Sequence, residues 1–536
     1  MSGNFKRENR EIPKASGDES DRSANATGGT ADVNAEGSSS WFMADGSIVP
    51  AKAANKGGAE PSAELPEERG PAKRNIDQDT LRRTQSREKR RSCGLAGVRD
   101  AARKDGKLRF TALLHHVNEG SLSEAFFQLK KTAAVGVDKV TWHEYEQGLQ
   151  DNIVDLNGRI HRGAYRAKPT RRVWIPKPDG RQRPLGVTSL EDKIVQQAVL
   201  QVLQSIYEQD SLGFSYGFRP GRSCHQALDA LSVGLTSKRV GWVLDADVSG
   251  FFDAIDHEWL IKFLEHRIGD QRILRLIRKW LRAGVSEEGE WSETKVGTPQ
   301  GAVISPLLAN VYLHYVFDLW VEWWRRKHSR GDVIVVRYAD DFVIGFEHRT
   351  DAEQCLESLR TRFAQFGLKL HPEKTRLIEF GPFASYRRKK RGEGRPDTFG
   401  FLGFTHVCDK TRKNGWFVIR RHTIAKRMRA TVAAIKQQLR RRMHRPVGET
   451  ARWLRRVVQG WLNYYAVPGN YQKLKEFVDE VSKHWLTALR RRSQKGKDRW
   501  TWRRMRRLIR KHLPTPRILH PYPKDRFRAR LKAGAV

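Results

Sequence analysis

Short apolar runs rich in β-branched residues alternate, in the middle of the chain, with longer segments whose apolar residues recur every three or four positions. The runs at 240–244 and 333–336 predict buried strands, and the segments 190–207 and 352–366 predict amphipathic helices. From about residue 415 the pattern becomes helical, basic and rich in tryptophan. We therefore expect ordered structure to begin near Leu108, with an α+β domain over residues 108–406 and an all-helical domain over 407–520.

The two ends of the chain lack this patterning. Residues 1–75 are rich in Ser, Gly, Ala, Asn and Glu, which predicts a disordered extension. Residues 76–107 form a basic lead-in that includes Leu81–Arg91, and residues 521–536 form a basic tail. The lead-in is compatible with a nucleic-acid-binding arm and equally with a solvated helix, and the sequence leaves both readings open.

Charge changes the picture more than length does. The 536 residues carry a formal net charge of +39, far more than solubility requires, which indicates a large polyanionic partner such as nucleic acid. A stretch of membrane-spanning length, a lipidation motif and an apolar signal core are all missing from the sequence, so no membrane partner is expected. The cysteines are scattered without a CxxC pair, which argues against a zinc module and fits a reducing cytoplasm: Cys93, Cys224, Cys355 and Cys408.

Candidate chemistry appears where two adjacent carboxylates, Asp340 and Asp341, interrupt the apolar segment Val333–Phe346. The flanking runs predict two strands, so both acids would project from a tight hairpin turn. Like charges held together in a partly dry setting repel unless cations neutralise them, and a hard divalent ion such as Mg²⁺ suits oxygen ligands. The alternative is a hairpin turn that is merely acidic, since Asp is common in turns.

A second acidic cluster lies in the segment Trp242–His257. Its apolar start predicts a strand that ends in Asp245 and Asp247, whose side chains share one side because strands alternate their faces. An acid at the end of one strand and an acid pair on an adjacent hairpin can jointly hold two cations. At a spacing of ~3.5–4 Å such ions stabilise the attacking and leaving oxygens of an in-line phosphoryl displacement, which is what nucleotidyl transfer requires.

These two clusters carry a family resemblance. Tyr338–Asp341 resembles the YXDD box of reverse transcriptases, and Asp247–Asp253 resembles their first palm aspartate motif. Further blocks follow in the order typical of the group II intron-encoded reverse transcriptase/maturase family, which the chain resembles over roughly residues 108–520: Ala134–Asp138, Pro169–Leu185, Phe214–Ser223, Gly297–Pro306, Gly367–Thr375, Phe401–Phe404 and Gly460–Tyr465.

The resemblance implies a right-hand polymerase, with α+β fingers and palm built on an antiparallel sheet and an all-helical thumb and maturase domain. It implies RNA-directed DNA synthesis from dNTPs, with Asp247, Asp340 and Asp341 as catalytic residues. These three and Val248 would be the ligands of two Mg²⁺ ions. The implied partners are the group II intron RNA, an RNA template with a DNA primer, and target DNA, and a homodimer stays open.

Substrate contacts follow from the same blocks. Residues Trp174–Leu185 predict a hairpin whose basic tip presents Lys177, Arg181 and Arg183, either to a triphosphate or to template alone. By resemblance, Phe252 would stack under the sugar and exclude a 2′-hydroxyl, although an ordinary core phenylalanine remains an alternative. The predicted dNTP contacts are Lys177, Arg183, Phe252, Gln300, Gly301 and Lys374, the last of which is equally compatible with a solvated lysine.

Primer and RNA contacts complete the prediction. Phe401, Leu402, Gly403 and Phe404 resemble the primer grip, though by themselves they predict only a short strand. Basic residues interleaved with Trp500 and Trp502 are typical of RNA binding, whereas a charge run is more often a solvated face. The expected RNA contacts are Arg171, Arg172, Arg181, Arg219, Arg222, Trp500, Trp502, Arg503, Arg504 and Arg507. Gly460–Tyr465 resembles the maturase signature, and we expect most of its aromatic side chains to be helix core.

The chain also departs from the family pattern. Paired cysteines and histidines of an HNH endonuclease do not follow Cys408, so we expect a bacterial-type member that synthesises DNA without cutting its own target strand. Such a protein would be cytoplasmic and nucleoid-associated when on DNA. Two alternatives stay open: a domesticated reverse transcriptase, or an RNA-binding splicing cofactor with little polymerase activity. An RNA-templated RNA polymerase is disfavoured by Phe252.

Overall fold

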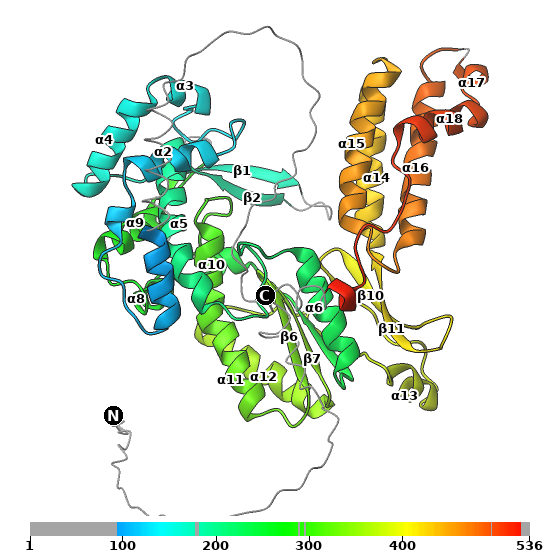
Figure 1. Ribbon diagram of the computed structural model, residues 1–536, viewed down its shortest axis with the longest axis horizontal. Helices are drawn as coiled ribbons and strands as arrows, with labels where there is room; N and C mark the ends of the chain where they lie inside the picture. Colours follow the sequence, from blue (N-terminus) through cyan, green and yellow to red (C-terminus); the bar gives the residue numbers. More distant parts are fainter. Residues whose placement is uncertain (1–93, 177–181, 288–289, 294–295, 495, 527–536) are drawn as a thin grey trace, which may run out of the picture. The chain divides into compact units, whose positions relative to one another are not determined.

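The computed structural model describes residues 94–176, 182–287, 290–293, 296–494 and 496–526 (Figure 1). The predictions for residues 1–75, for Leu81–Arg91, for Lys177 and Arg181, and for the tail beyond residue 526 therefore lie outside the described residues. Residues 94–104 form a helix in which Ala102 is buried, and Leu95 and Val98 pack against the main core. The expectation that ordered structure begins near Leu108 was wrong, because this basic segment still carries an apolar helical face.

Helices dominate the first half of the chain. Side chains cap several of them: Ser189 accepts a hydrogen bond from the backbone of Asp192, and Ser223 forms a capping box with Gln226. The labelled helices up to residue 327 are η1 Leu114–His116, α2 Glu119–Gln128, α3 Trp142–Gln147, α4 Leu149–His161, α5 Leu190–Asp210, α6 Cys224–Ser237, α7 Phe251–Ala254, α8 His257–Glu265, α9 Gln271–Arg282, α10 Ser305–Leu313, η2 His314–Asp318 and α11 Leu319–Lys327.

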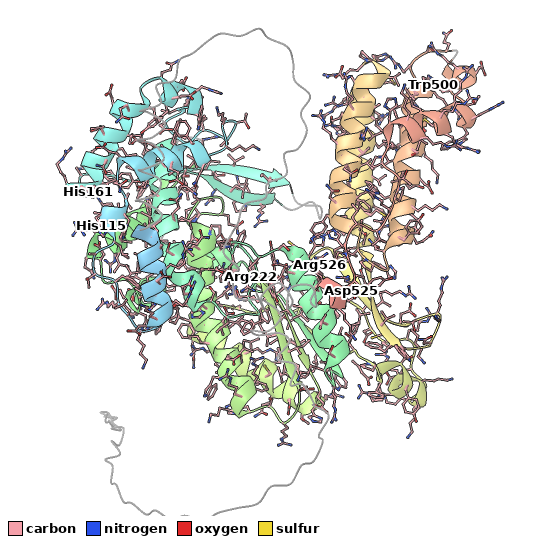
Figure 2. The ribbon with its side chains drawn as sticks, viewed as in Figure 1. His115, His161, Arg222, Trp500, Asp525 and Arg526 are labelled. Carbon is pink, nitrogen blue, oxygen red and sulfur yellow. The ribbon has the colours of Figure 1, made fainter. Side chains whose placement is uncertain are left out.

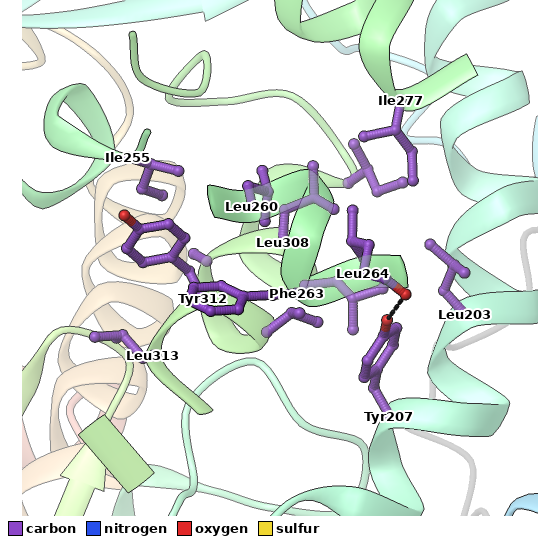
Figure 3. Packing of buried hydrophobic residues seen from close by; sticks show 14 of the residues in the cluster. Leu203, Tyr207, Ile255, Leu260, Phe263, Leu264, Ile277, Leu308, Tyr312 and Leu313 are labelled. Carbon is purple, nitrogen blue, oxygen red and sulfur yellow. Dashed lines mark hydrogen bonds between the residues drawn. The ribbon is translucent and has the colours of Figure 1, made fainter. Parts of the chain in front are cut away.

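The largest hydrophobic core joins these helices. Figure 3 shows side chains from α5, α8 and α10 interleaved, with Phe263 and Tyr312 in edge-to-face contact at 5.4 Å between ring centroids. Tyr207 is buried and donates a hydrogen bond of 3.2 Å to the carbonyl of Leu264, which satisfies its hydroxyl inside the core. This core supports one face of the sheet that carries the acidic residues.

That sheet has the order β6-β7-β3-β8, and all its neighbours are antiparallel. Leu244 packs into the main core while its neighbour Val243 packs into a second core beneath α6, so both faces of β3 are buried. Burial on both faces explains why the strands are continuous apolar runs. The strands are β3 Trp242–Ala246, β6 Val333–Tyr338, β7 Asp341–Phe346 and β8 Arg376–Glu379, and α12 Arg349–Gln365 contacts β3 and β7.

A second sheet, of order β2-β1-β4-β5, contains the predicted hairpin. Strands β1 Thr170–Pro176 and β2 Gln182–Val187 pair antiparallel from Arg171–Val187 to Pro176–Gln182, which confirms that hairpin. Strand β4 Val285–Glu287 joins β1 in parallel and pairs with β5 Glu290–Ser292. The sheet is therefore mixed, because more than a hundred residues separate β1 from β4 and the chain returns in the same direction.

The last part of the chain begins with a small sheet, not with helices. Strands β9 Phe399–Phe401, β10 Phe404–Lys410 and β11 Phe417–Thr423 pair antiparallel, after the short helix α13 Ala384–Lys390. The expectation of helical structure from about residue 415 was therefore early, since the alternating pattern of Phe417–Thr423 belongs to a strand. The helices that follow are α14 Ala425–Arg441, α15 Val447–Tyr465, α16 Tyr471–Arg490, α17 Gly496–Arg499 and α18 Trp502–His512.

Taken together, the described residues form a mixed α and β structure with antiparallel sheets, consistent with the α+β prediction. Helices α14, α15 and α16 lie side by side around their own apolar core, which includes Trp461 and Trp485 (Figure 1). None of the helices among the described residues is long and apolar enough to cross a membrane.

Candidate active site

The acid pair lies at the tip of a two-residue β-hairpin. Tyr338 pairs with Asp341 as the last step of the β6–β7 ladder, which leaves only Ala339 and Asp340 in the turn. Ala339 has a φ of +58°, a left-handed conformation that such tight turns require. The structure thus confirms the predicted hairpin, and the two acids project from a rigid connection.

Asp247 follows the adjacent strand and lies at the same edge of the sheet. In the β3–β7 ladder Ala246 pairs with Phe342, so one more step of the same register brings Asp247 opposite Asp341. Two backbone contacts fix the chain here: the carbonyl of Asp247 accepts from the amide of His371 at 2.8 Å, and Val248 bridges to Leu370. The strand ends at Ala246, so Asp247 is the first residue beyond it.

The negative charge of Asp247 lies close enough to Asp340 and Asp341 to raise the pKa of both. Burial, and then the neighbouring charges of Asp340 and Asp247, raise the pKa of Asp341 to about 7. Burial also raises the pKa of Asp340, and the negative charge of Asp247 raises it further. The Asp341 side chain keeps contact with solvent, so protein atoms surround the acids while water still reaches them. Lys374 and Arg427 offset part of this negative charge, yet the pKa of Asp341 stays raised, and the remaining negative charge favours a bound cation.

Two basic side chains pair with acids at the end of β3. Lys374 forms an ion pair with Asp247, and Arg376 lies 3.5 Å from Asp245, whose pKa burial raises to about 6. Among the residues that the structure describes, no three His, Cys, Asp or Glu side chains converge closely enough to hold a metal ion by themselves. The donors present are oxygens, which suit a hard divalent cation. That the backbone carbonyl of Val248 adds to them stays a prediction.

The turn rests on a buried charge that sequence reasoning missed. Arg337 is 1% exposed and donates to Asp318 at 2.7 Å, to Asn310 at 3.0 Å and to the carbonyl of Ala339 at 2.9 Å. Asp318 ends the π-helix η2 and is equally buried. The guanidinium therefore ties the turn to α10 and η2. A charged residue inside an otherwise apolar strand was the available signal.

A second support comes from the segment before α6. The amide of Tyr216 donates to the carbonyl of Arg337 at 2.9 Å, and Asn310 donates to the carbonyl of Gly217 at 2.8 Å. A Cβ added to Gly217 would lie 2.3 Å from the amide nitrogen of Ala339, so only glycine permits this approach. The block Phe214–Ser223 thus packs directly on the acid turn.

The structure brings together three of the predicted nucleotide contacts. The guanidinium of Arg183 on β2 donates to the side-chain oxygen of Gln300 at 2.8 Å, and the carbonyl of Gln300 accepts from the amide of Gly186 at 2.7 Å. Gly301 has a φ of +115°, and a Cβ there would lie 2.9 Å from the carbonyl oxygen of Gly186.

Phe252 lies next to the same loop. Its carbonyl accepts from the amide of Thr298 at 2.8 Å, and its half-buried ring packs against the main core. Lys374, by contrast, lies with the acids, through its pair with Asp247. The role of each of these residues stays a prediction.

Phe401–Phe404 form the turn of the β9–β10 hairpin. Leu402 and Gly403 both have positive φ, and Phe401 pairs with Phe404. The hydroxyl of Tyr464 on α15 donates to the carbonyl of Leu402 at 2.8 Å, which ties the turn to the helical region. Trp461 and Leu462 in the same helix are buried, as expected for core residues.

The expected RNA contacts divide by exposure. Arg503, Arg504 and Arg507 on α18 are exposed, as is Trp502, whereas Trp500 is half-buried between α17 and α18 (Figure 2). Arg171 and Arg172 are half-buried; Arg171 donates to the carbonyl of Val135 at 2.7 Å, and Arg172 lies 3.4 Å from Glu287.

Arg219 requires a correction. It is 8% exposed and bonds to Glu208 and to the carbonyls of Leu212 and Ser215, so its guanidinium is occupied inside the protein and is not available to RNA. Arg222 is half-buried beside Tyr216, with its guanidinium 5.6 Å from the ring centroid. The sequence pattern did not reveal either feature, because both depend on how the irregular segment between α5 and α6 folds back on itself.

Comparison with known proteins agrees with this geometry. Residues 175–406 match the family model of the reverse transcriptase (RNA-dependent DNA polymerase) domain. The chain is 34% identical to Protein YkfC of Escherichia coli over 312 residues, which are 51% of this chain and 81% of that protein. It is 44% identical to the group II intron-encoded protein LtrA of Lactococcus lactis over 166 residues. The chain belongs to the group II intron reverse transcriptase/maturase family.

Members of this family match the chain over different lengths. The match with LtrA covers 31% of this chain and 27% of LtrA. Nuclear intron maturase 2 of Arabidopsis thaliana is 30% identical over 112 residues, which are 20% of this chain and 15% of that protein. The chain therefore spans less than a third of the length of these two relatives and four fifths of the length of YkfC. Reverse transcriptase domains use divalent metal ions, and the oxygen-rich edge of the β6-β7-β3-β8 sheet is chemically suited to them.

Proposed function

We propose that the protein is an RNA-directed DNA polymerase that joins dNTPs to a primer on an RNA template. The observation that carries this proposal is the meeting of Asp247 with Asp340 and Asp341 at one edge of the sheet, where burial and neighbouring carboxylates raise the pKa values of Asp340 and Asp341. Repulsion between carboxylates would only destabilise a turn with a purely structural role. In a site that holds cations, the same cluster of carboxylates supplies the ligands, and the bound cations neutralise the repulsion.

The ligands of two Mg²⁺ ions would be Asp247, Asp340, Asp341 and the carbonyl of Val248. When bound, the ions lower the pKa of the primer 3′-hydroxyl and stabilise the departing pyrophosphate. The side chains of the protein would bind the ions and the nucleotide and hold them in orientation. Lys374, which pairs with one oxygen of Asp247, would lie next to the ions and could contact a phosphate oxygen of the nucleotide.

The loop around Gln300 and Gly301 would receive the nucleotide. Arg183 is exposed on β2 and already bonds to Gln300, so its remaining donors can reach the triphosphate together with Lys177 at the hairpin tip. Phe252 would lie under the sugar and exclude a 2′-hydroxyl. The turn Phe401–Phe404 would hold the primer end, since Tyr464 fixes it to α15.

A primer-extension assay tests the proposal. With an annealed RNA template, a DNA primer, dNTPs and Mg²⁺, Asp340→Asn and Asp341→Asn should each lower the rate of synthesis by at least about 10²-fold, since each removes charge where it stabilises the transition state. Glu357→Gln on the exposed surface of α12 removes a similar charge and should leave the rate unchanged. The proposal fails if the unmodified protein makes no DNA, or if both Asn variants match it.

We infer a second role as a maturase that binds its intron RNA and assists splicing. Helices α14–α18 would form the thumb and maturase domain, and the exposed arginines of α18 beside Trp502 supply charge and a stacking surface. Mobility of the intron would bring target DNA to the same protein. Splicing at low Mg²⁺ separates the roles, because Asp340→Asn should still accelerate it if binding alone is needed.

A further inference from the structure

Aromatic side chains are unusually exposed in the part of the chain between β8 and β11. Of the large hydrophobic side chains among the described residues, the four most exposed include Trp416 at 71%, Tyr386 at 69% and Phe383 at 65%. These three lie within 34 residues of one another in sequence. Large aromatic residues are normally buried, so their concentration on one short segment indicates a binding surface.

This segment is held firmly in place. Helix α13 carries Phe383 at its N-terminal boundary and Tyr386 one turn later, and it is anchored by Arg387 and Arg391, which both pair with the buried Glu379 of β8. Trp416 ends a tight loop in which Thr411 donates to the carbonyl of Trp416 at 2.8 Å and accepts from its amide at 3.0 Å. The exposed rings are therefore presented on fixed backbone.

The segment that carries the rings is also strongly basic. Residues 383–416 contain nine Lys and Arg against three Asp and Glu. Arg387, Arg388 and Arg391 are used in ion pairs with neighbouring acids. The other six have no ion pair among the residues that the structure describes: Lys389, Lys390, Arg395, Lys410, Arg412 and Lys413. The surface therefore suits a flexible polyanion with exposed aromatic groups.

The position of this surface separates it from the polymerase site. Strand β10 begins at the Leu402–Gly403 turn and ends at Lys410, beside the loop that carries Trp416. Seven residues at about 3.3 Å each place that loop roughly 20 Å along the strand from the turn. The thiol of Cys408 contacts the carbonyl of Gly381 at 3.8 Å, which brings β10 against the start of α13.

We propose that Phe383, Tyr386 and Trp416, with Lys389, Lys390 and Lys413, bind a segment of single-stranded RNA outside the polymerase site. The lysines neutralise phosphates and the rings stack on unpaired bases. A duplex hides its bases, so the surface prefers single strands. This inference does not depend on DNA synthesis.

The test uses the full chain and a labelled 20-nucleotide oligouridine, with binding followed by fluorescence anisotropy at 0.3 M salt, where contacts that are only electrostatic are weak. The variant Phe383→Ala/Tyr386→Ala/Trp416→Ala keeps every charge and should bind at least about tenfold more weakly. Photocrosslinking of 5-iodouridine RNA, with the crosslinked peptides identified by mass spectrometry, should map to residues 383–416.

The control is Trp323→Ala on α11, which removes another exposed aromatic ring (51%) outside residues 383–416 and should leave affinity unchanged. A second variant, Lys389→Gln/Lys390→Gln/Lys413→Gln, should reduce the slope of log affinity against log salt by about two, because three phosphate contacts are lost. Unaltered circular dichroism verifies that the variants are folded.

The proposal is overturned if the aromatic variant binds oligouridine as the unmodified protein does and no crosslink falls within residues 383–416. It is also overturned if the aromatic variant instead changes the oligomeric state, since the surface then binds protein. Primer extension on a short template should be unaffected by these variants. If the unmodified protein crosslinks to RNA through residues 383–416 but makes no DNA, the polymerase proposal is refuted and the RNA-binding surface is supported.

Discussion

The side chain of Arg337 places a full positive charge inside the apolar core beneath the Tyr338–Asp341 turn. Its charge is matched by Asp318, which is also 1% exposed, and its remaining donors reach Asn310 and the carbonyl of Ala339. A planar guanidinium can hold several acceptors in one fixed arrangement, which an ammonium cannot. Arg337 is therefore a positioning residue for the acid turn.

The variant Arg337→Lys tests this role. Lysine keeps the charge near Asp318 but loses the contacts with Asn310 and Ala339, so we expect kcat for primer extension to fall by about 10²-fold through misplacement of the turn. The KM for dNTP should change little, because Arg337 lies beneath the turn and away from the Gln300 loop. Arg349→Lys on the exposed surface of α12 is the control and should match the unmodified protein. A rise in the KM for dNTP with an unchanged kcat would contradict this role of Arg337.

For single residues, the sequence predicts which side chains are candidates for the site better than it predicts whether a side chain is accessible to a ligand. Asp340 and Asp341 stand out because charge rarely lies between two apolar runs, and the structure places both at the turn. Arg219 and Arg222 look alike in sequence, yet Arg219 is buried by Glu208 and backbone carbonyls. Those partners are set by the fold, so local pattern cannot separate the two arginines.

Among the elements, the β9-β10-β11 sheet contains a buried histidine at its centre. His406 is fully buried, pairs with Arg421 and Phe399 in the ladders, and stacks on the Phe399 ring at 4.7 Å between centroids. Burial, and then the charge of Arg421, lower the pKa of His406 to about 3. The unfolded chain, in which this histidine has its usual pKa, binds a proton more readily than the folded one.

It follows that the free energy of unfolding decreases as pH falls from about 6.5 toward 3, because protons favour the unfolded state in that window. The variant His406→Phe should lose up to one proton of this dependence, or about 1.4 kcal/mol per pH unit. Urea denaturation at pH 7 and pH 5 measures the difference. His143→Phe changes an exposed histidine and should keep the slope of the unmodified protein. If the free energy of unfolding of His406→Phe depends on pH as steeply as that of the unmodified protein, the predicted contribution of His406 is wrong.

Elements whose pairing is local were predictable, and those with distant partners were not. The hairpins at Trp174–Leu185 and Val333–Phe346 follow from apolar runs on either side of turn residues. The parallel pairing of β1 with β4 joins residues far apart in sequence, and no local pattern specifies it. The β10–β11 hairpin was missed because basic residues obscure the alternation in Phe417–Thr423.

For the molecule as a whole, Asp229 on α6 links three distant parts of the chain. Its carboxylate lies 3.1 Å from Arg421 on β11 and 3.0 Å from Arg526 near the end of the described residues. Nearby, His520 stacks on His225, and the amide of Leu519 donates to the carbonyl of Ala466. The segment after α18 thus returns to α6, and one buried acid balances two arginines.

Replacing Asp229 by alanine leaves Arg421 buried without its partner, which we expect to lower the free energy of unfolding by about 3–5 kcal/mol. Asp409→Ala removes an acid from the exposed pair with Arg420 and should cost no more than about 1 kcal/mol. Chemical denaturation of both variants measures the contrast. Equal losses in the two variants would mean that Asp229 is not a structural link between these segments.

The sequence by itself determined the family, the candidate acidic residues, the polyanionic character of the partner and the local hairpins. Each of these depends on residue type and on neighbours within a few positions, which a sequence records directly. Only the tertiary structure decided that Asp247 meets Asp341, that Arg337 supports the turn, that Arg219 is occupied, and that Phe383, Tyr386 and Trp416 remain exposed. Burial and charge pairing depend on how segments pack in three dimensions, whether their residues are near or far apart in the sequence, so they exist only once the chain has folded.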